Sequence, residues 1–454
     1  MRPLIAVRSV PRTRDGLFLV GALLLCLVVG DVLPGRLESS SALSVTLVPA
    51  ALVFLLIAGW LAFVRPVAAI LLAFALLGVV RIEPAPVDLV FALLIAATVA
   101  TTHIRPQLPP FVSIPLAGFA LLTIISITNA VDLHRAVKFE SITLYMIALA
   151  VWLSWSFTKE RVVRVAIKAY IVAAAASGAL GLAALYLPLP SKAYFLYGGA
   201  RAEGLFKDPN VYSAFLVPAA VILLEELSSR RIIWWRRSVT IVTFGIISVG
   251  VLVAYSRAAW LDYGVAVTTL VGVLALRRGG LGAAAKSVAI ILAGTLAGFL
   301  TLYATGSLTF LQQRSRYQAY DSQRFANQSS ALHEMTAHVF GFGPGQAEVL
   351  LPRSTHSSFL RVAFEQGLLG LTLLVVILVA TLICALILAR RRVDVNGVGT
   401  AALLGLWLGQ LANAFFIDSI HWRHLWIFAA LIWCGYMMLS DRSGAQMPAR
   451  SSPG

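Results

Sequence analysis

Long apolar stretches alternate with short polar segments along almost the whole chain of 454 residues. A helix needs about 20 consecutive apolar residues to cross a bilayer, because lipid offers the backbone no hydrogen-bond partner. The pattern predicts about fourteen such runs, of which 67–80 is short enough to be re-entrant. They cover residues 16–33, 42–64, 67–80, 87–103, 110–129, 139–157, 162–187, 209–227, 239–255, 259–276, 285–304, 358–389, 399–417 and 422–440.

The composition agrees with a membrane protein. Hydrophobic residues make up 59% of the chain and charged residues 12%, about half the charged fraction of a soluble domain. An ordinary soluble enzyme and a disordered chain are both excluded. We expect an all-α polytopic membrane protein with about 12–14 transmembrane helices. The predicted parts are N-terminal transmembrane helices in 1–187, a second transmembrane region in 188–440 with outer loops 188–208 and 305–357, and a disordered cytoplasmic tail in 441–454.

The charge distribution predicts the orientation. Lys and Arg number 36 against 20 Asp and Glu, and the basic residues are scattered between apolar runs, which indicates a positive-inside bias rather than nucleic-acid binding. With both termini in the cytoplasm, the dense clusters at 230–237, 277–280 and 389–393 all fall inside. The three cysteines lie within apolar runs, so neither a disulfide framework nor a zinc site is expected.

Arginines on the predicted outer face run against that bias. Arg201 lies in the sequence RAEGLFKDPN (201–210), and Arg257 stands between two apolar runs with almost no loop around it. An arginine near membrane depth is costly and usually faces a charged partner or a polar cavity. One explanation is a salt bridge between Arg257 and Asp262. The other is an anion site, because a guanidinium donates two parallel hydrogen bonds to a diphosphate.

His356 begins the sequence HSSFL (356–360), shortly after the glycine-rich GFGPG (341–345). Its imidazole could take a hydroxyl proton as a general base, although a histidine at a membrane boundary is also typical of an interfacial hydrogen bond. The glycines predict turns rather than a phosphate site.

Two further groups favour structural roles. Glu365 lies about two and a half helical turns beyond His356, too far for direct contact, so we expect it to pack or cap a helix. His421 and His424 could form half a metal site, but Asp418 is the only carboxylate close to them in sequence. We therefore expect both histidines to be interfacial and no metal to be bound.

Taken together, several segments between about 190 and 440 resemble the O-antigen ligase and Wzy-type polysaccharide polymerase superfamily. The first half of the chain matches only as generic hydrophobic spans. The order, spacing and common outer placement of the motifs carry the resemblance. In chain order they are the Arg-x-x-Gly…Asp-Pro-Asn segment (201–210), Ser-Arg (256–257), the glycine-rich 341–345, 356–370 with its His and Glu-x-Gly, and Asp418 to Trp426.

The resemblance implies a fold similar to C-type membrane glycosyltransferases in the bacterial inner membrane, with the active site facing the periplasm. Such relatives move a glycan from an undecaprenyl diphosphate carrier to lipid A-core or to a growing glycan. It implies metal-independent, cofactor-free inverting transfer, with His356 as the base that activates the acceptor hydroxyl. The residues implied as diphosphate ligands are Arg201, Arg257 and Arg324, and those implied as supporting residues are Asn210, Asp418 and Arg423.

The long outer loop of 305–357 favours O-antigen ligase over polymerase, which shares these motifs. Two other classes compete. A transporter or flippase of lipid-linked or anionic substrates predicts charges near mid-membrane and repeated halves, whereas these arginines cluster outside in the second half. A non-catalytic envelope scaffold predicts that alanine is tolerated at His356. The partners we expect are the carrier-linked donor, a glycan or lipid A-core acceptor, and membrane lipids, with no nucleic acid.

Overall fold

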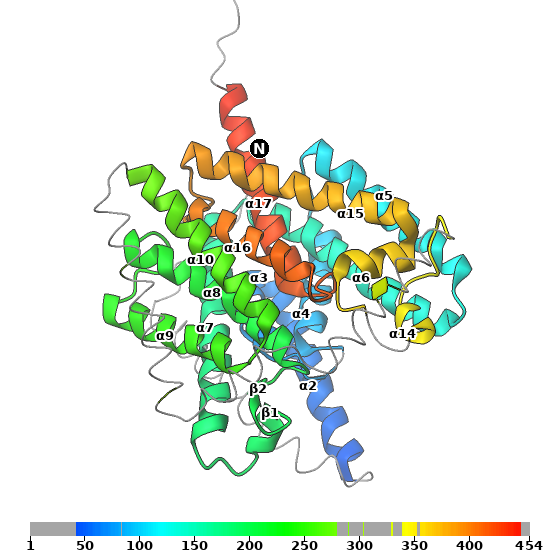
Figure 1. Cartoon of the computed structure of the whole chain (residues 1–454), viewed down its shortest axis with the longest axis horizontal. Coiled ribbons are helices and arrows are strands. Elements are labelled where there is room, and N and C mark those ends of the chain that lie inside the picture. The colour runs from blue at the N-terminus through cyan, green and yellow to red at the C-terminus, as the bar shows by residue number, and fades with distance from the viewer. Residues whose placement is uncertain are drawn as a thin grey trace, which may run out of the picture.

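The computed structural model describes residues 42–82, 84–278, 338–351 and 355–445, together with the single positions 289, 303, 328 and 329. This part of the chain is a bundle of helices (Figure 1). Each apolar run predicted between 42 and 440 coincides with a helix, apart from 285–304, of which only 289 and 303 are described; the run 16–33 lies outside the described residues. The prediction of a helical, multi-pass membrane protein is confirmed.

The helices are named by their order along the chain. They are α2 (Ala42–Val64), α3 (Pro66–Ala75), α4 (Pro86–Thr101), α5 (Pro110–Ser126), α6 (Leu133–Ser156), α7 (Glu160–Tyr186), α8 (Pro209–Ser228), α9 (Arg237–Val253), α10 (Arg257–Arg278), α14 (Ala347–Leu350), α15 (Ser358–Arg391), α16 (Thr400–Ala414) and α17 (Arg423–Ala445). Short 3₁₀ turns are η2 (Leu76–Gly78), η3 (Ile127–Asn129) and η4 (Lys192–Phe195), and the strands β1 (Leu196–Tyr197) and β2 (Arg201–Ala202) form an antiparallel hairpin.

The described apolar helices differ in length. Seven described helices are long and apolar enough to cross a membrane: 110–129, 133–156, 160–186, 209–228, 257–277, 358–391 and 423–442. Four other apolar helical segments are only 10–17 residues long. The apolar run that continues to Val80 is shorter as a helix because α3 begins after Arg65 and ends in η2 at Gly78. The described residues thus include both helices long enough to span a membrane and shorter apolar helices.

Local sequence sets where the helices begin. Proline has no backbone N–H to leave unpaired and a φ suited to a helix start, and it is the first residue of four described helices: α3, α4, α5 and α8.

 The proline fixes the start of each of these four helices. Aspartates cap two helices: the Asp132 side chain accepts from Arg135 N before α6, and Asp208 accepts from Asn210 N before α8.

The loops gather at two opposite ends of the bundle. One end, called the outer end here, carries residues 79–82, 84–88, 127–135, 187–208, 338–351, 355–357 and 415–422; the inner end carries 102–109, 157–159, 229–236 and 392–399. Figure 1 shows β1 and β2 at the bottom, whereas α17 ends at the top. The β1–β2 hairpin and the C-terminal end of α17 thus lie apart.

One large hydrophobic core runs through the described bundle, and two small clusters lie apart from it, around Phe195 and around Phe364. Helices on either side of residue 187 pack together, with α5 against α15, α6 against α17, and α7 against α8 and α9. The predicted boundary at 187 therefore falls between elements that share one core. α17 ends at Ala445, and the rest of the predicted tail lies outside the described residues.

Candidate functional site

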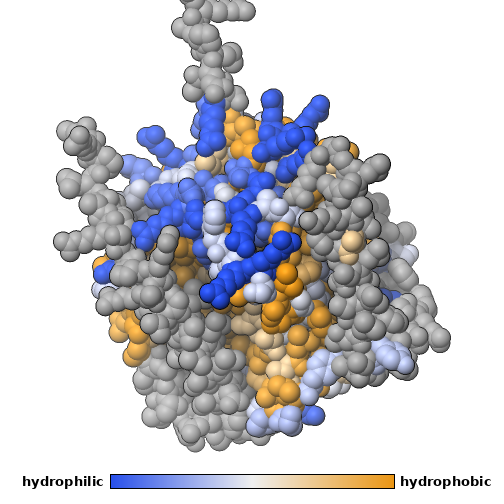
Figure 2. All heavy atoms as spheres, turned by 90° about the vertical axis from the view of Figure 1, so that its left-hand side faces the viewer, coloured by the Kyte–Doolittle hydropathy of each residue, from blue (hydrophilic) through white to orange (hydrophobic). Residues whose placement is uncertain are grey.

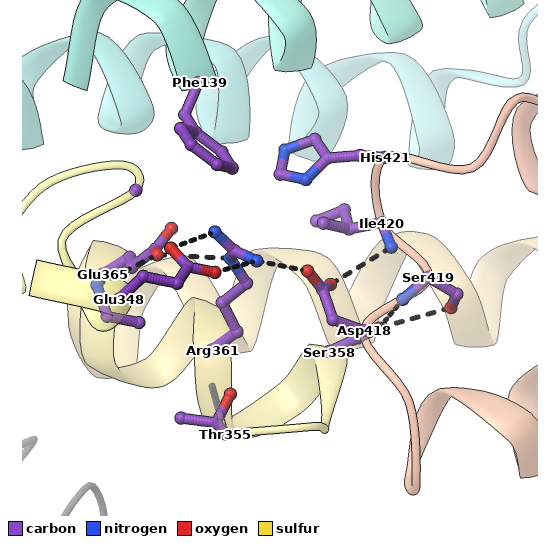
Figure 3. Close-up of polar contacts among 12 residues, drawn as sticks. Phe139, Glu348, Thr355, Ser358, Arg361, Glu365, Asp418, Ser419, Ile420 and His421 are labelled. Atoms are coloured by element: carbon purple, nitrogen blue, oxygen red, sulfur yellow. Dashed lines mark hydrogen bonds and ion pairs between the residues drawn. The ribbon is translucent and has the colours of Figure 1, made fainter. Parts of the chain in front are cut away.

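The outer end is organised around a buried arginine, Arg361, in the first turns of α15. Only 5% of this residue is exposed, and its guanidinium faces three carboxylates from three segments. The distances are 2.6 Å from Nη1 to Asp418 Oδ2, 3.0 Å from Nη1 to Glu348 Oε1 and 3.2 Å from Nε to Glu365 Oε1. Figure 3 shows Arg361 pointing between Asp418 on one side and the two glutamates on the other. It thereby joins α14, α15 and the loop before α17.

Aromatic and basic side chains from α6 complete this cluster. The Phe139 ring lies 4.9 Å from the Arg361 guanidinium carbon and 5.3 Å from that of Arg135, within the range of cation–π attraction. Arg135 also approaches Glu348, at 3.3 Å. Burial by itself would raise the pKa of Asp418, but the positive charges of Arg361 and His421 and the hydrogen bonds to its oxygens outweigh burial, so its pKa lies below the ordinary value.

The glycine-rich segment 341–345 packs backbone against backbone. Phe342 N donates to Phe364 O at 3.0 Å and Gly343 N to Glu365 O at 2.8 Å, where Gly367 interrupts the helical geometry of α15 with φ 72°. A Cβ on Gly341 would lie 2.4 Å from the Glu365 carbonyl, so no other residue fits there. The glycines make close turns, as the sequence predicted. The Glu365 side chain accepts from Ala347 N, at 3.3 Å, and so caps α14.

His356 occupies an unusual backbone position at the start of α15. Its φ is 50°, a left-handed conformation that costs a non-glycine residue free energy and is often found at functional sites. The side chain is exposed. Ser357 follows as the N-cap and accepts from Leu360 N, and Ser358 Oγ accepts from Ser419 N at 2.8 Å. The start of α15 is therefore held against the loop before α17.

Arg201 and Asn210 lie together, beside the segment that leads into Arg257. Arg201 Nε donates to Ala254 O at 2.9 Å, and its Nη2 reaches Asn210 Oδ1 at 3.4 Å. Tyr255 has φ 50°, the same as His356, and Ser256 then accepts from Ala259 N at 3.4 Å. Two of the motif segments thus share one local design, in which a left-handed residue precedes a serine cap and a long helix.

Asp262, which the sequence suggested as a salt-bridge partner of Arg257, makes its hydrogen bond with α16. Asp262 is fully buried in α10, and Asn413 Nδ2 of α16 donates to its Oδ2 at 3.5 Å. The carboxylate therefore faces α16.

Both acidic and basic supporting residues form ion pairs across the bundle. Asp418 pairs with Arg361, and Arg423 pairs through two nitrogens with both carboxylate oxygens of Asp88 in α4. Next to Arg423 lies a cavity of about 180 Å³. Its lining combines basic and aromatic side chains with apolar ones: Leu77, Val80, Phe206, Lys207, Val211, Phe215, His421, Trp422, Arg423 and His424.

The two histidines of this region differ in burial: His424 is buried and His421 is half-buried. His424 is 4% exposed, with its ring 6.4 Å from that of Phe215. His421 Nε2 lies 3.1 Å from Thr143 Oγ1 and its ring 5.7 Å from that of Phe139. Each ring thus packs against the ring of a phenylalanine.

The structure therefore brings some of the predicted residues together and leaves others apart. Arg201 and Asn210 meet beside the 254–257 segment, whereas His356 belongs to the segment bound at 417–419. These contacts do not by themselves set His356 beside Arg201. Arg324 lies outside the described residues. Sequence reasoning missed Arg361 as an organising residue, although an arginine four positions before Glu365 in an apolar run was a usable signal.

Comparison with models of known protein families and with curated proteins gave no match. The argument for a function accordingly depends on the chemistry of the residues gathered at the outer end.

Proposed function

We propose that this protein is a membrane glycosyltransferase of the O-antigen ligase type. It would move a glycan from an undecaprenyl diphosphate carrier to lipid A-core at the periplasmic face of a bacterial inner membrane. The reaction proposed is metal-independent and inverts the anomeric carbon. The polymerase of the same superfamily, which extends a carrier-linked glycan, is the close alternative.

One observation carries the proposal: Arg201 bonds to Ala254, three residues before Arg257. Two separate arginine motifs of the resemblance are thereby adjacent at one end of the bundle. The same end carries His356 in a left-handed conformation and the Arg361 cluster that holds its helix. An exposed imidazole and several guanidinium groups at a membrane surface are the groups that base-assisted displacement of a diphosphate requires.

The proposed reaction assigns a step to each group. His356 accepts the proton of the acceptor hydroxyl while that oxygen attacks the anomeric carbon of the donor sugar. The bond between the anomeric carbon and the diphosphate oxygen breaks, and the diphosphate leaves with the electron pair. Arg201 and Arg257 stabilise the negative charge that develops on it. Attack from the opposite side of the sugar inverts its configuration.

Transfer by the purified protein tests this mechanism directly. With a carrier-linked glycan and lipid A-core as substrates, transfer should continue in excess EDTA. Arg201→Lys and Arg257→Lys should each lose donor binding and transfer, because lysine offers one point charge in place of a planar fork. Arg390→Lys, at the exposed inner end of α15, is the matched control and should behave as wild type. Abolition by EDTA with recovery on adding Mg²⁺ contradicts the proposal.

A strain that lacks the protein separates ligase from polymerase. Uncapped lipid A-core together with long carrier-linked glycan identifies a ligase. Single carrier-linked repeats identify a polymerase. A surface glycan of normal amount and length contradicts both.

A second candidate, transport of a lipid-linked or anionic substrate, is favoured by polar groups buried between α10 and α16. Asp262, Gln410 and Asn413 are at most 3% exposed. In the described part of the chain, Asp262 Oδ1 and both polar atoms of the Gln410 side chain have no hydrogen-bond partner. Buried ionisable groups at membrane depth often mark a substrate pathway. Proteoliposomes would distinguish the candidates: a transporter moves the labelled carrier lipid between leaflets and loses this on Asp262→Asn, whereas a transferase shows no such movement.

A further inference from the structure

A second polar region, at the inner end, is unrelated to the proposed reaction. The connection between α8 and α9 has the sequence RRIIWWRR (230–237) and encloses a cavity of about 230 Å³. The residues lining the cavity are Glu226, Leu227, Ser228, Ser229, Arg230, Trp234, Trp235, Arg237 and Thr240. Figure 2 looks onto the side of the bundle where α9 lies, and hydrophilic side chains gather there above a hydrophobic region.

The fold of this connection directs its charge outward. The buried Glu226 carboxylate accepts from Arg231 N at 3.1 Å and from Ile232 N at 2.7 Å. Ile232 and Ile233, which follow Arg231, are at most 1% exposed and belong to the core. The negative charge that lines the cavity is thus engaged by backbone amides. The arginines on either side of the isoleucines are left on the surface.

Most of those arginines carry their charge without a carboxylate partner. Arg231 pairs with Asp394. Arg230, Arg236 and Arg237 are exposed, and within the residues the structure describes none of the three forms an ion pair. The cavity therefore has a positive rim, formed by Arg230 and Arg237, that an anion would neutralise.

Trp234 and the adjoining face of α9 identify the kind of anion. Trp234 is 64% exposed and left-handed, with φ 57°, and its Nε1 donates to Arg231 O at 2.8 Å. An exposed tryptophan beside arginines is typical of the membrane–water interface. Directly beyond the cavity, α9 presents exposed apolar side chains, Val239 at 46% and Val242 at 61%. A ligand that follows this surface needs a charged head and an apolar tail.

We propose that the cavity between α8 and α9 binds the headgroup of an anionic phospholipid. The phosphate contacts Arg230 and Arg237, the headgroup hydroxyls face the polar lining of the cavity, and an acyl chain lies along Val239 and Val242. Basic pockets at the ends of membrane helices have the chemistry that phosphate headgroups require. This inference does not depend on the proposed glycosyl transfer.

Native mass spectrometry of the full chain in detergent tests the site. The probes are dioleoyl phosphatidylglycerol, dioleoyl phosphatidylcholine and inorganic phosphate. The wild-type protein should retain phosphatidylglycerol in preference to phosphatidylcholine, and inorganic phosphate at the same concentration should not displace it. The paired variant R230Q/R237Q should weaken phosphatidylglycerol binding by about tenfold, the contribution of a charge-assisted hydrogen bond.

The matched control is R390Q/R391Q, which removes the same charge from exposed positions at the same end. Its phosphatidylglycerol binding should stay close to wild type. W234A, which leaves every charge in place, should weaken binding as well. Equal retention of the two lipids, equal losses in the two arginine pairs, or displacement by inorganic phosphate would each overturn the assignment of a lipid headgroup site.

Discussion

The two ends of the bundle hold their buried charges in opposite ways. At the outer end the central buried charge is positive: Arg361 is surrounded by Glu348, Glu365 and Asp418. At the inner end it is negative: Glu226, 7% exposed, accepts backbone N–H groups of 231–232, and arginines lie on the surface. A buried charge needs partners in both cases, but they come from different distances along the chain.

The two ends also differ in how far along the sequence the partners of the buried charge lie. The amides that satisfy Glu226 lie within seven residues of it, so the inner connection can fold locally. One partner of Arg361, Glu365, lies four residues away on the same helix, but Glu348 and Asp418 lie 13 and 57 residues away. The outer arrangement therefore depends on the packing of separate segments. Motif residues on loops can then be fixed relative to one another by the bundle as a whole. The inner connection is held by local backbone contacts, and the outer end is held by contacts between segments far apart in the sequence.

The largest effect we expect is the loss of transfer on His356→Ala. General-base catalysis typically contributes about 10²–10⁴-fold, and transfer should fall by that factor while donor binding is retained, because the base acts on the acceptor proton. The measurements are the transfer rate and carrier-lipid binding of the purified variant. His134→Ala changes another exposed histidine of the outer end and should retain normal transfer. Equal rates in the two variants would remove His356 from the mechanism.

Arg361→Met should produce the largest loss of stability. Removing one partner of a buried charge cluster typically costs about 3–5 kcal/mol, and here three carboxylates would lose their shared cation. Thermal unfolding in detergent measures the change. Arg164→Met is the matched control, since its ion pair with Glu160 is exposed on α7 and such pairs contribute about 0–1 kcal/mol. Similar losses for Arg361 and Arg164 would show that the outer cluster adds little to stability.

A smaller loss is expected on Glu226→Gln at the inner end. The amide keeps an acceptor oxygen but turns a donor toward backbone N–H groups, which typically costs about 1–3 kcal/mol. Transfer should be unchanged in the folded variant, because the residue lies at the opposite end from His356. Hydrogen exchange of the Arg231 and Ile232 amides measures the local effect, with exposed Glu160→Gln as control. Unchanged protection in Glu226→Gln would contradict the anchoring role of this carboxylate.

The helices were predictable from sequence, and the outer cluster was not. The composition of a run such as 358–389 predicts a helix. The interruption of that helix at Gly367 depends on a close contact with Gly341, 26 residues earlier in the chain. Arg361 was visible only as a basic residue in an apolar run, because Glu348 and Asp418 approach it through tertiary packing. The apolar runs 67–80 and 239–255 form the short helices α3 and α9, and the sequence already marked the first of them as short. The function classes still rest on the motifs.

The smallest effects concern pH and separate two carboxylates of the outer end. The lowered pKa of Asp418 means that its contribution to stability is complete above about pH 3.9, the unfolded value, and is lost as the pH falls through the folded pKa. Burial raises the pKa of Glu203, and Arg81 offsets only part of that, so stability should fall as the pH rises from about 4.3 through the folded pKa. The difference in unfolding temperature between wild type and Asp418→Asn should therefore become smaller as the pH falls. The unfolding temperature of Glu203→Gln should instead rise relative to that of wild type as the pH rises. Parallel curves for both variants would show that neither carboxylate titrates differently in the folded protein.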